Sequence, residues 1–394
     1  MKNLDLLKGR NPWEYLLGLT LPLGLLFSLV SISLEQIFIA LSIVIWAIKL
    51  RRNKERFAAP SFFFPLLAYA VLSIFSSIFS VNPGVSLKDS RELLLFLIIP
   101  LVYTSFSKIK DLDRTTWALL SSGYLAAGYS LIYYFSKALP GERIKGFMGH
   151  YMTQAGVLIL FCSLALSVVV FERRKIRWLW GISLLLALFS LALTLTRSAW
   201  IGFFVVVCFM LFLYKPITLL LVPVLAGLVF LASPQPMKKR ALSVFNMDYF
   251  SNRQRLEYLR VGIKIIKEYP FLGTGPDTVD MVFQNPKYGL SDEAKRNVHL
   301  HDNLVQIAAE RGILTLIAWL VFIVWAFLTL LKLLRNKSPG LSPITAGALA
   351  AILALMTAGF FEYNFGDSEV STLFLYLITI PFAYLRLQNK DERS

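Results

Sequence analysis

Apolar runs long enough to cross a lipid bilayer recur along almost the whole chain and restrict it to a helical membrane fold. A helix needs about 17–25 mainly apolar residues to span about 30 Å of hydrocarbon. A membrane β-strand would need about ten residues of alternating polarity, and this alternation is absent. Hydrophobic residues make up 56% of the chain, whereas soluble domains contain about 45–50%. We therefore expect an all-α polytopic membrane protein whose backbone polar groups pair within the helices.

The apolar runs predict about twelve transmembrane helices and divide the chain into three parts. The predicted spans lie near residues 14–33, 35–49, 61–80, 92–106, 115–136, 153–171, 178–195, 198–214, 217–232, 312–331, 342–361 and 369–387. Residues 1–232 hold about nine of these spans. Residues 233–311 form one large, partly helical loop between spans 9 and 10. Residues 312–394 hold about three spans and a short tail.

Lysine and arginine alternate between the loops as the positive-inside rule requires, if the N-terminus is cytoplasmic. The inner loops and tail contain Lys49, Arg51, Arg52, Lys54, Arg56, Lys108, Lys110, Arg114, Arg173, Arg174, Lys175, Arg177, Lys215, Lys332, Arg335, Lys337, Arg386, Lys390 and Arg393. The short outer loops contain only Lys88, Arg91, Lys137, Arg143, Lys145 and Arg197. An error of one span would reverse this pattern downstream. We therefore expect an even number of spans, both termini in the cytoplasm, and the 233–311 loop outside.

The net charge of +16 follows in large part from this asymmetry, so it does not indicate a nucleic-acid partner. Cys162 and Cys208 both fall inside apolar runs, so we read them as small buried hydrophobes and expect no disulfide framework. Lys2, Lys8 and Arg10 precede the first apolar run. No clear cleavage site follows it, which is typical of a signal anchor.

The 233–311 loop is basic and contains one predicted amphipathic helix, over residues 253–268. Its apolar residues at helical spacing are Leu256, Leu259, Ile263 and Ile266. Pro270 should end this helix, and the following Gly273–Pro276 segment should form a turn. The 238–240 cluster of two lysines and one arginine is interpreted as a contact with lipid headgroups.

Arginines on the outer face are candidates for binding an anion. Arg197 lies at the end of a hydrophobic hairpin, where it either anchors the helix end in the headgroup region or binds phosphate with its planar fork of donors. Arg253 and Arg255 either form the solvated face of a surface helix or act as an anion clamp that faces the membrane.

All three histidines fall at or near the outer face. His299 and His301 form an H-x-H pair, but a zinc site would need a third or fourth ligand, and no second ligand group has suitable spacing. A general base is the better interpretation for His301, because histidine titrates near neutral pH. A hydrogen-bonded structural role remains open for both residues. His150, in a glycine-rich segment, is interpreted as structural or substrate-lining.

Three local segments resemble motifs of the O-antigen ligase and polymerase superfamily of bacterial membrane glycosyltransferases. They are TLTRSAWIGF, RLEYLRVGIKIIKEYPFLGTGPD and HDNLVQIAAERG. The first two resemble the arginine motifs of the family and the third resembles its histidine motif. The resemblance extends over nearly the whole chain, because the number of spans and the position of the large loop also agree, and it is greatest to the ligases.

This resemblance implies an enzyme of the bacterial inner membrane whose active site faces the periplasm. It would transfer a glycan from undecaprenyl pyrophosphate to a hydroxyl of the lipid A core oligosaccharide, with inversion and without a metal or other cofactor. Arg197 and Arg255 would hold the pyrophosphate and His301 would activate the acceptor, while Arg143, His150, Arg253 and His299 are further candidates for substrate contact. The expected partners are this donor, this acceptor and membrane lipids, and not nucleic acid.

Two alternatives remain open. A polymerase that extends the repeat-unit chain would use the same donor and could share the motifs. A transporter of lipid-linked glycans belongs to a different class of protein, and it would be expected to show internal repeats and interrupted helices with charges at the membrane midplane.

Overall fold

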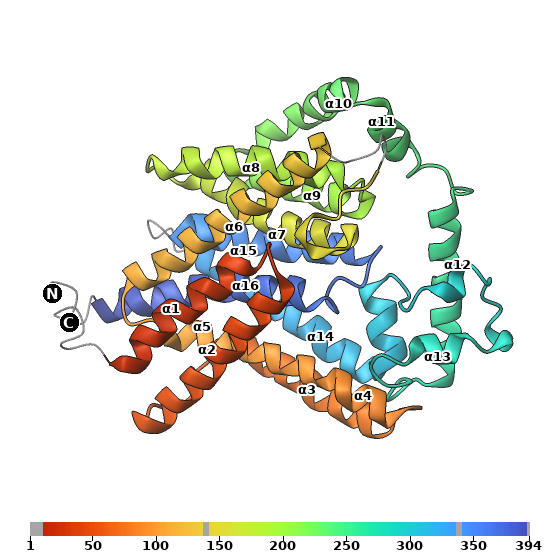
Figure 1. The fold of residues 1–394 in the computed structure, drawn as a ribbon, viewed down its shortest axis with the longest axis horizontal. Helices are drawn as coiled ribbons and strands as arrows, with labels where there is room; N and C mark the ends of the chain where they lie inside the picture. The colour runs from red at the N-terminus through yellow and green to blue at the C-terminus, as the bar shows by residue number, and fades with distance from the viewer. Residues whose placement is uncertain (1–10, 137–141, 336–340, 392–394) are drawn as a thin grey trace.

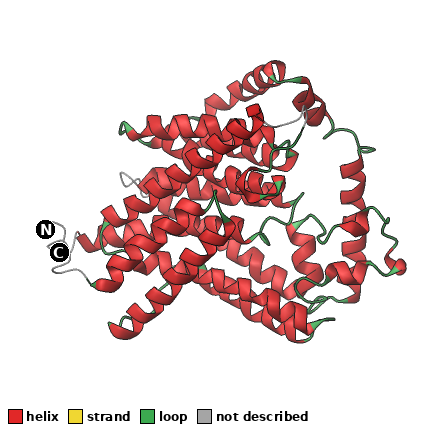
Figure 2. Cartoon of the chain, in the orientation of Figure 1, coloured by secondary structure: helices red, strands yellow, loops and turns green. Residues whose placement is uncertain are grey.

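The computed structural model describes residues 11–136, 142–335 and 341–391, and these residues form helices and loops without a strand (Figures 1 and 2). The helices are α1 (Pro12–Phe27), α2 (Ile32–Arg52), α3 (Phe63–Ile78), α4 (Pro83–Asp89), η2 (Ser90–Leu97), α5 (Ile98–Ser105), α6 (Ile109–Ser136), η3 (Gly146–Met148), α7 (Tyr151–Phe171), α8 (Ile176–Leu193), α9 (Arg197–Tyr214), η4 (Pro216–Leu221), α10 (Val222–Ala232), α11 (Gln235–Leu242), α12 (Phe250–Glu268), α13 (Val279–Phe283), η5 (Pro286–Tyr288), η6 (Ala294–Arg296), α14 (Asn303–Arg335), α15 (Leu341–Gly359) and α16 (Ser368–Asp391).

Seven helices of the described chain are long and apolar enough to cross a membrane: α2, α7, α8, α9, α14, α15 and α16. The expected all-α architecture is therefore confirmed for these residues. The count of twelve spans stays a prediction, because several expected spans are short or interrupted. The span near 92–106 consists of η2 followed by α5, and the span near 217–232 consists of η4 followed by α10.

The centre of the bundle is α15, which packs against α7, α9 and α16. Its small residues allow this close packing. A side chain at Gly347, for example, would meet Leu164 of α7 at 2.9 Å. Both α7 and α15 are buried along most of their length, so these two helices form the rigid frame to which the outer-face elements attach.

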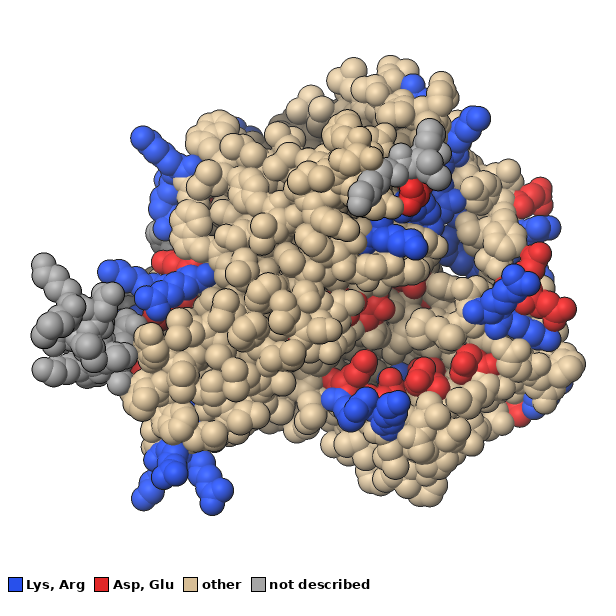
Figure 3. Space-filling model, viewed as in Figure 1, with Lys and Arg blue, Asp and Glu red and all other residues tan. Residues whose placement is uncertain are grey.

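Charged side chains gather at the two ends of the molecule and leave a broad uncharged belt between them (Figure 3). The start of α1 and the end of α16 lie at one end, and α12 and α13 lie at the other (Figure 1). The start of α1 and the end of α16 thus lie on the side of the molecule opposite α12 and α13. The number of crossings, the side of the membrane on which the 233–311 loop lies, and the side that faces the cytoplasm stay predictions.

The 233–311 loop contains the expected amphipathic helix, α12, which ends at Glu268 just before Pro270. The loop also has a small hydrophobic core of its own, separate from the bundle core. Its buried members are Tyr258, Val261, Ile265, Val279, Phe283, Tyr288, Leu290, Ala294, Leu300 and Ala309. Ala309 belongs to α14, so this second core joins the loop to a membrane helix.

A break in α14 fixes the turn after α12. Gly312 has φ +81° and ψ 166° inside α14, a conformation that strongly favours glycine. The break frees carbonyl groups that the turn uses: Thr274 N–H donates to Ala309 O (2.9 Å) and Gly275 N–H donates to Glu310 O (2.8 Å). The segment 303–311, which the sequence assigns to the loop, is therefore helical and forms the first part of α14.

Candidate active site

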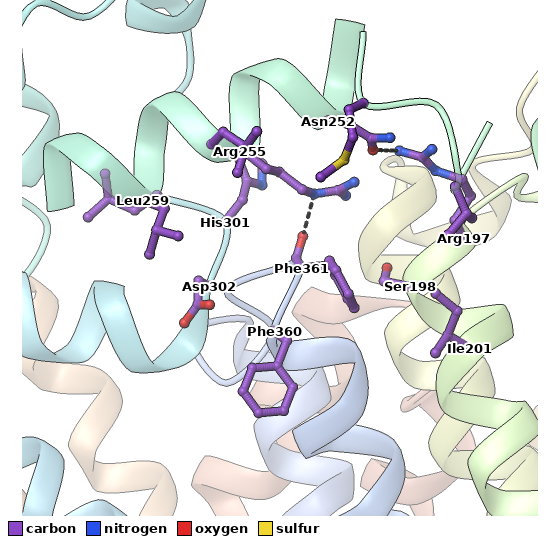
Figure 4. Close-up of a pocket in the computed structure, with 14 residues that line it drawn as sticks. Arg197, Ser198, Ile201, Asn252, Arg255, Leu259, His301, Asp302, Phe360 and Phe361 are labelled. Carbon is purple, nitrogen blue, oxygen red and sulfur yellow. Dashed lines mark hydrogen bonds between the residues drawn. The ribbon is translucent and has the colours of Figure 1, made fainter. Parts of the chain in front are cut away.

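A pocket of about 260 Å³ lies where α12 passes over the start of α9 and the loop after α15 (Figure 4). It is lined by Arg197, Ser198, Ile201, Val244, Met247, Asn252, Arg255, Leu256, Leu259, Leu300, His301, Asp302, Phe360 and Phe361. The three residues predicted to be catalytic come from three distant parts of the sequence and meet here. The structure therefore brings residues from all three motifs to one pocket.

His301 lies directly before α14 and forms a hydrogen bond with a carboxylate. Its Nδ1 is 3.0 Å from Oε2 of Glu362, and its ring lies 5.4 Å from the ring of Tyr258. The residue has φ +53°, which is uncommon for a residue with a side chain and is often found at functional sites. With Nδ1 donating to the carboxylate, the neutral ring leaves Nε2 as the proton acceptor.

Glu362 stays ionised beside this ring. Burial raises the pKa of Glu362, but the hydrogen bond from His301 and the positive charge nearby, including that of Arg255, outweigh burial, so the pKa lies below its ordinary value. A carboxylate in this position orients the imidazole and stabilises its protonated form, as the aspartate does in a serine protease triad.

Asp302 caps the helix that carries the histidine motif. Its Oδ1 accepts hydrogen bonds from Leu304 N (2.7 Å) and Val305 N (3.0 Å), as an N-cap residue does. Burial raises the pKa of Asp302 above its ordinary value. Because both bonds hold the backbone immediately after His301, Asp302 fixes the position of the histidine.

Arg255 offers the free anion-binding donors of the pocket. Its Nε donates to Phe361 O (3.2 Å), and its guanidinium lies 5.7 Å from the Phe361 ring. Within the described chain, neither terminal nitrogen of Arg255 has a hydrogen-bond partner. Burial lowers the pKa of Arg255, and Arg240 lowers it further, while Glu362 opposes them. This half-buried cation with unoccupied donors is suited to bind an anion.

Arg197 lines the same pocket, but loop residues already use its terminal nitrogens. Nη1 donates to Ser243 O (2.8 Å) and Ser243 Oγ (3.0 Å). Nη2 donates to Ser251 Oγ (2.7 Å) and Asn252 Oδ1 (2.6 Å). The arginine therefore ties the start of α12 to the start of α9 and adds positive charge to the pocket, whereas direct contact with pyrophosphate stays a prediction.

Arg143 and Arg240 lie near Arg197 and Arg255. Arg143 donates from Nε to Thr194 O (2.9 Å) and from Nη2 to Thr196 Oγ1 (3.0 Å), and it stacks on the ring of Tyr151. Burial, together with the charges of Arg240 and Arg255, lowers the pKa of Arg143 to about 10, so the residue remains cationic at neutral pH. These arginines thus lie close enough to act on one another's charge.

Arg253, His150 and His299 do not line the pocket. The side chain of Arg253 is exposed on α12, which fits the solvated-face interpretation. The ring of His150 stacks on Tyr151 (4.5 Å) beside Arg143. His299 packs edge-on against Tyr363 (5.5 Å), and burial lowers its pKa. Substrate contact by these three residues stays a prediction.

No group of three or more histidine, cysteine, aspartate or glutamate side chains is placed to hold a metal ion in the part of the chain that the structure describes. Nδ1 of His301 is hydrogen-bonded to Glu362, which is not the arrangement expected if His299 and His301 chelated a metal ion together. That the reaction needs no metal stays a prediction for experiment.

Residues 182–320 match the family model described as O-antigen ligase. This segment, about a third of the chain, is therefore similar to the O-antigen ligase family. The resemblance inferred from the three motifs is thereby confirmed, because the matched segment includes Arg197, Arg255 and His301. No curated protein matches the chain.

Two residues of the site escaped sequence analysis. Glu362 lies outside the segment that matches the family model, in the loop between α15 and α16. Its signal was an acidic residue in a loop predicted to be on the outer face, but histidine-carboxylate pairs have no fixed spacing in sequence. Arg240 was interpreted as a headgroup contact, whereas it donates to Leu195 O (3.1 Å) and to the Tyr249 hydroxyl (3.1 Å) beside Arg197.

Proposed function

We propose that this protein is a glycosyltransferase that moves a glycan from undecaprenyl pyrophosphate to a hydroxyl of the lipid A core oligosaccharide, without a metal. The single observation that carries the proposal is the pocket that Arg255 and His301 line together, with Glu362 hydrogen-bonded to the histidine. A general base next to a cluster of cations is the minimum requirement for displacing a pyrophosphate leaving group with a hydroxyl.

In the proposed reaction, Nε2 of His301 takes the proton of the acceptor hydroxyl. The acceptor oxygen then forms a bond to the anomeric carbon from the face opposite the leaving group, and the bond from that carbon to the pyrophosphate oxygen breaks. The sugar configuration inverts in this single displacement. Glu362 stabilises the imidazolium that forms, and the electron pair of the broken bond stays on the pyrophosphate.

Arg255 would bind the departing pyrophosphate through its free terminal nitrogens. Charge accumulates on this group as the bond breaks, so a preorganised guanidinium stabilises the transition state more than the bound donor. Arg143, Arg197 and Arg240 add positive charge nearby, and Arg197 also holds the segment that precedes Arg255.

Replacement of Arg255 tests the role of the pocket. We expect Arg255→Ala to lower kcat by about 10²–10³, the usual effect of removing one preorganised donor. Arg255→Lys should restore activity only in part, because an ammonium lacks the planar fork. Arg260→Ala, an exposed arginine on the same helix, is the matched control and should be near normal. Normal transfer by Arg255→Ala at normal expression would contradict the proposal.

Deletion of a ligase and deletion of a polymerase should leave different lipopolysaccharide products in the host. Deletion of a ligase should remove all long chains from lipopolysaccharide while lipid-linked polymer accumulates. Deletion of a polymerase should leave a core that bears one repeat unit. We propose the ligase, because the sequence resembles that branch more closely, and a one-repeat product on a gel would replace it with the polymerase.

The proposed location is the inner membrane, with both termini in the cytoplasm and the pocket facing the periplasm. Labelling with a membrane-impermeant thiol reagent tests this in a variant that lacks Cys162 and Cys208. Ser291→Cys, in the exposed loop after α13, should label in intact spheroplasts, and Arg174→Cys, between α7 and α8, should not. The opposite pattern would reverse the orientation.

A further inference from the structure

The segment that joins α11 to α12 turns its apolar side chains outward. Phe245 is 86% exposed and Met247 is 66% exposed, and Leu242 and Phe250 are exposed as well. Ser243, in the same segment, is only 6% exposed. Single exposed apolar side chains are common, but a group of them around a buried serine is not the pattern of a loop in water. We call Leu242, Phe245, Met247 and Phe250 the apolar patch.

Hydrogen bonds explain why the polar groups of this segment point inward. Ser243 O and Ser243 Oγ accept from Nη1 of Arg197 (2.8 and 3.0 Å). Asn252 Nδ2 donates to Ser243 O (3.0 Å) and to Asn246 O (2.7 Å). These carbonyl groups therefore have partners within the protein. Lipid can cover the apolar patch without leaving them unpaired, which would be costly in hydrocarbon.

The apolar patch lies level with the ends of two long apolar helices. Arg240, just before the patch, donates to Leu195 O (3.1 Å), and Arg197 holds Ser243 between the patch residues. Leu195 belongs to the turn between α8 and α9, which are both long and apolar enough to cross a membrane. The ends of such helices lie at the boundary between hydrocarbon and headgroups.

The exposed apolar surface of α10 leads to the patch. Every residue of α10 after Val222 is exposed in the described structure, and α10 and α11 form one edge of the molecule (Figure 1). The apolar patch, which follows α11, therefore extends a surface that already has the composition of a lipid contact.

Positive charge adjoins the apolar patch. Residues 233–252 contain three basic residues, at 238–240, and a single acidic residue, Asp248. Lys239 is exposed. An apolar face next to a lysine is complementary to a bilayer that contains anionic lipids, because the apolar side chains enter the acyl region while the ammonium stays with the headgroups.

We propose that the apolar patch inserts into the bilayer leaflet on the side of the arginine pocket, and that Lys239 contacts anionic headgroups there. A lipid surface fits better than a second protein chain, because the patch is level with the helix ends and extends the apolar surface of α10. The inference goes beyond the proposed function and does not depend on it. Since Val244 and Met247 line the arginine pocket, the bilayer then holds one wall of that pocket.

The depth of the patch is measured with an environment-sensitive probe. Phe245→Cys, in a full-length variant that lacks Cys162 and Cys208, is labelled with the fluorophore NBD in detergent and reconstituted into nanodiscs of phosphatidylcholine and phosphatidylglycerol. We expect a shift of the emission to shorter wavelength, strong quenching by spin-labelled lipid and little quenching by iodide. Ser291→Cys, in the exposed loop after α13, is the control and should show the reverse. Equal iodide quenching at the two positions would overturn the proposal. Protection of residue 245 from both quenchers would also overturn it, because a protein surface would then cover the patch.

Substitution of Phe245 tests whether the patch itself drives insertion. With the probe moved to Leu242→Cys, Phe245→Leu should keep the quenching by lipid, whereas Phe245→Asp should lose most of it and gain quenching by iodide. Phe245 belongs to neither buried core, so both variants keep the packed interior. Equal quenching in the two variants would overturn the role of the patch.

The headgroup contact is tested with the probe at residue 245. The local enrichment of spin-labelled phosphatidylglycerol over spin-labelled phosphatidylcholine should fall about fivefold in Lys239→Gln, the effect expected from one lysine near anionic lipid. Lys267→Gln, an exposed lysine on α12, is the control and should leave the enrichment unchanged. Equal effects of the two substitutions would overturn the role of Lys239. None of these measurements uses glycan transfer, so their outcome is independent of the proposed reaction.

Discussion

Glu362→Gln is the substitution that most directly tests the chemistry of the pocket. The change keeps the size of the side chain and removes its charge. In the structure, Nδ1 of His301 lies 3.0 Å from Oε2 of this carboxylate, and in the proposed reaction the ring gains a positive charge as it takes the acceptor proton. The carboxylate therefore stabilises the transition state more than the resting enzyme.

The magnitude follows from the strength of a charged hydrogen bond. Such bonds contribute about 1.5–3 kcal/mol in mutational series, and each 1.36 kcal/mol corresponds to a factor of ten in rate. We therefore expect Glu362→Gln to lower kcat by about 10- to 150-fold, while KM for the lipid-linked donor stays near that of wild type.

The assay is transfer of glycan by purified protein in nanodiscs, with donor and acceptor varied separately. Glu257→Gln is the matched control, since this glutamate on α12 binds Ser291 Oγ (2.7 Å) and not His301. The double variant Glu362→Gln with His301→Ala should be no slower than His301→Ala alone, because both residues act through one ring. Independent, multiplicative losses in the double variant would refute the paired-base mechanism.

Three other predictions concern backbone, pH and metals. Gly312→Ala should lower stability by about 1–3 kcal/mol, measured as a fall in Tm in detergent, because Gly312 has a positive φ and the added Cβ would collide with Phe271 O. Gly128→Ala is the control, since Gly128 has open space around it, and equal Tm values for the two variants would contradict the role of the break in α14. Burial lowers the pKa of His299 in the folded protein. Below about pH 6.5 the unfolded state therefore binds more protons than the folded state, and the free energy of unfolding decreases as the pH decreases. His299→Gln should therefore lose less Tm than wild type between about pH 7.5 and about 5.5, and an equal loss would refute this. Chelators should leave transfer unchanged, whereas loss of activity that a divalent ion restores would establish a metal requirement.

Sequence periodicity predicted the helical elements whose burial pattern is regular. The amphipathic pattern over 253–268 corresponds to α12, and a short turn over residues 194–196 joins α8 to α9, as the apolar runs predict. Spans that proline interrupts were harder to predict from the sequence. Pro216 and Pro223 divide the run near 217–232 into η4 and α10, a division that composition alone does not show.

A residue of the candidate site could be predicted from the sequence where its side chain would raise the free energy of the protein unless it found a partner. Arg197 stood out because an arginine at a span end must find a partner. Its actual partners, Ser243 and Asn252, are ordinary loop residues without such a signal. Glu362 needed the three-dimensional arrangement, because the loop that carries it meets His301 only after α14, α15 and α16 have packed.

The second hydrophobic core has a consequence for how the pocket opens. Arg255 and His301 both extend from elements that this core joins, namely α12 and the segment around Leu300. Arg197 and Phe361 extend instead from helices and loops of the membrane bundle. The pocket therefore lies between the loop core and the bundle, and three hydrogen bonds cross it: His301 to Glu362, Arg255 to Phe361 O, and Arg197 to Asn252. Widening the pocket to admit a bulky glycan would break these bonds, so the histidine would regain its carboxylate partner only when the loop core closes against the bundle again.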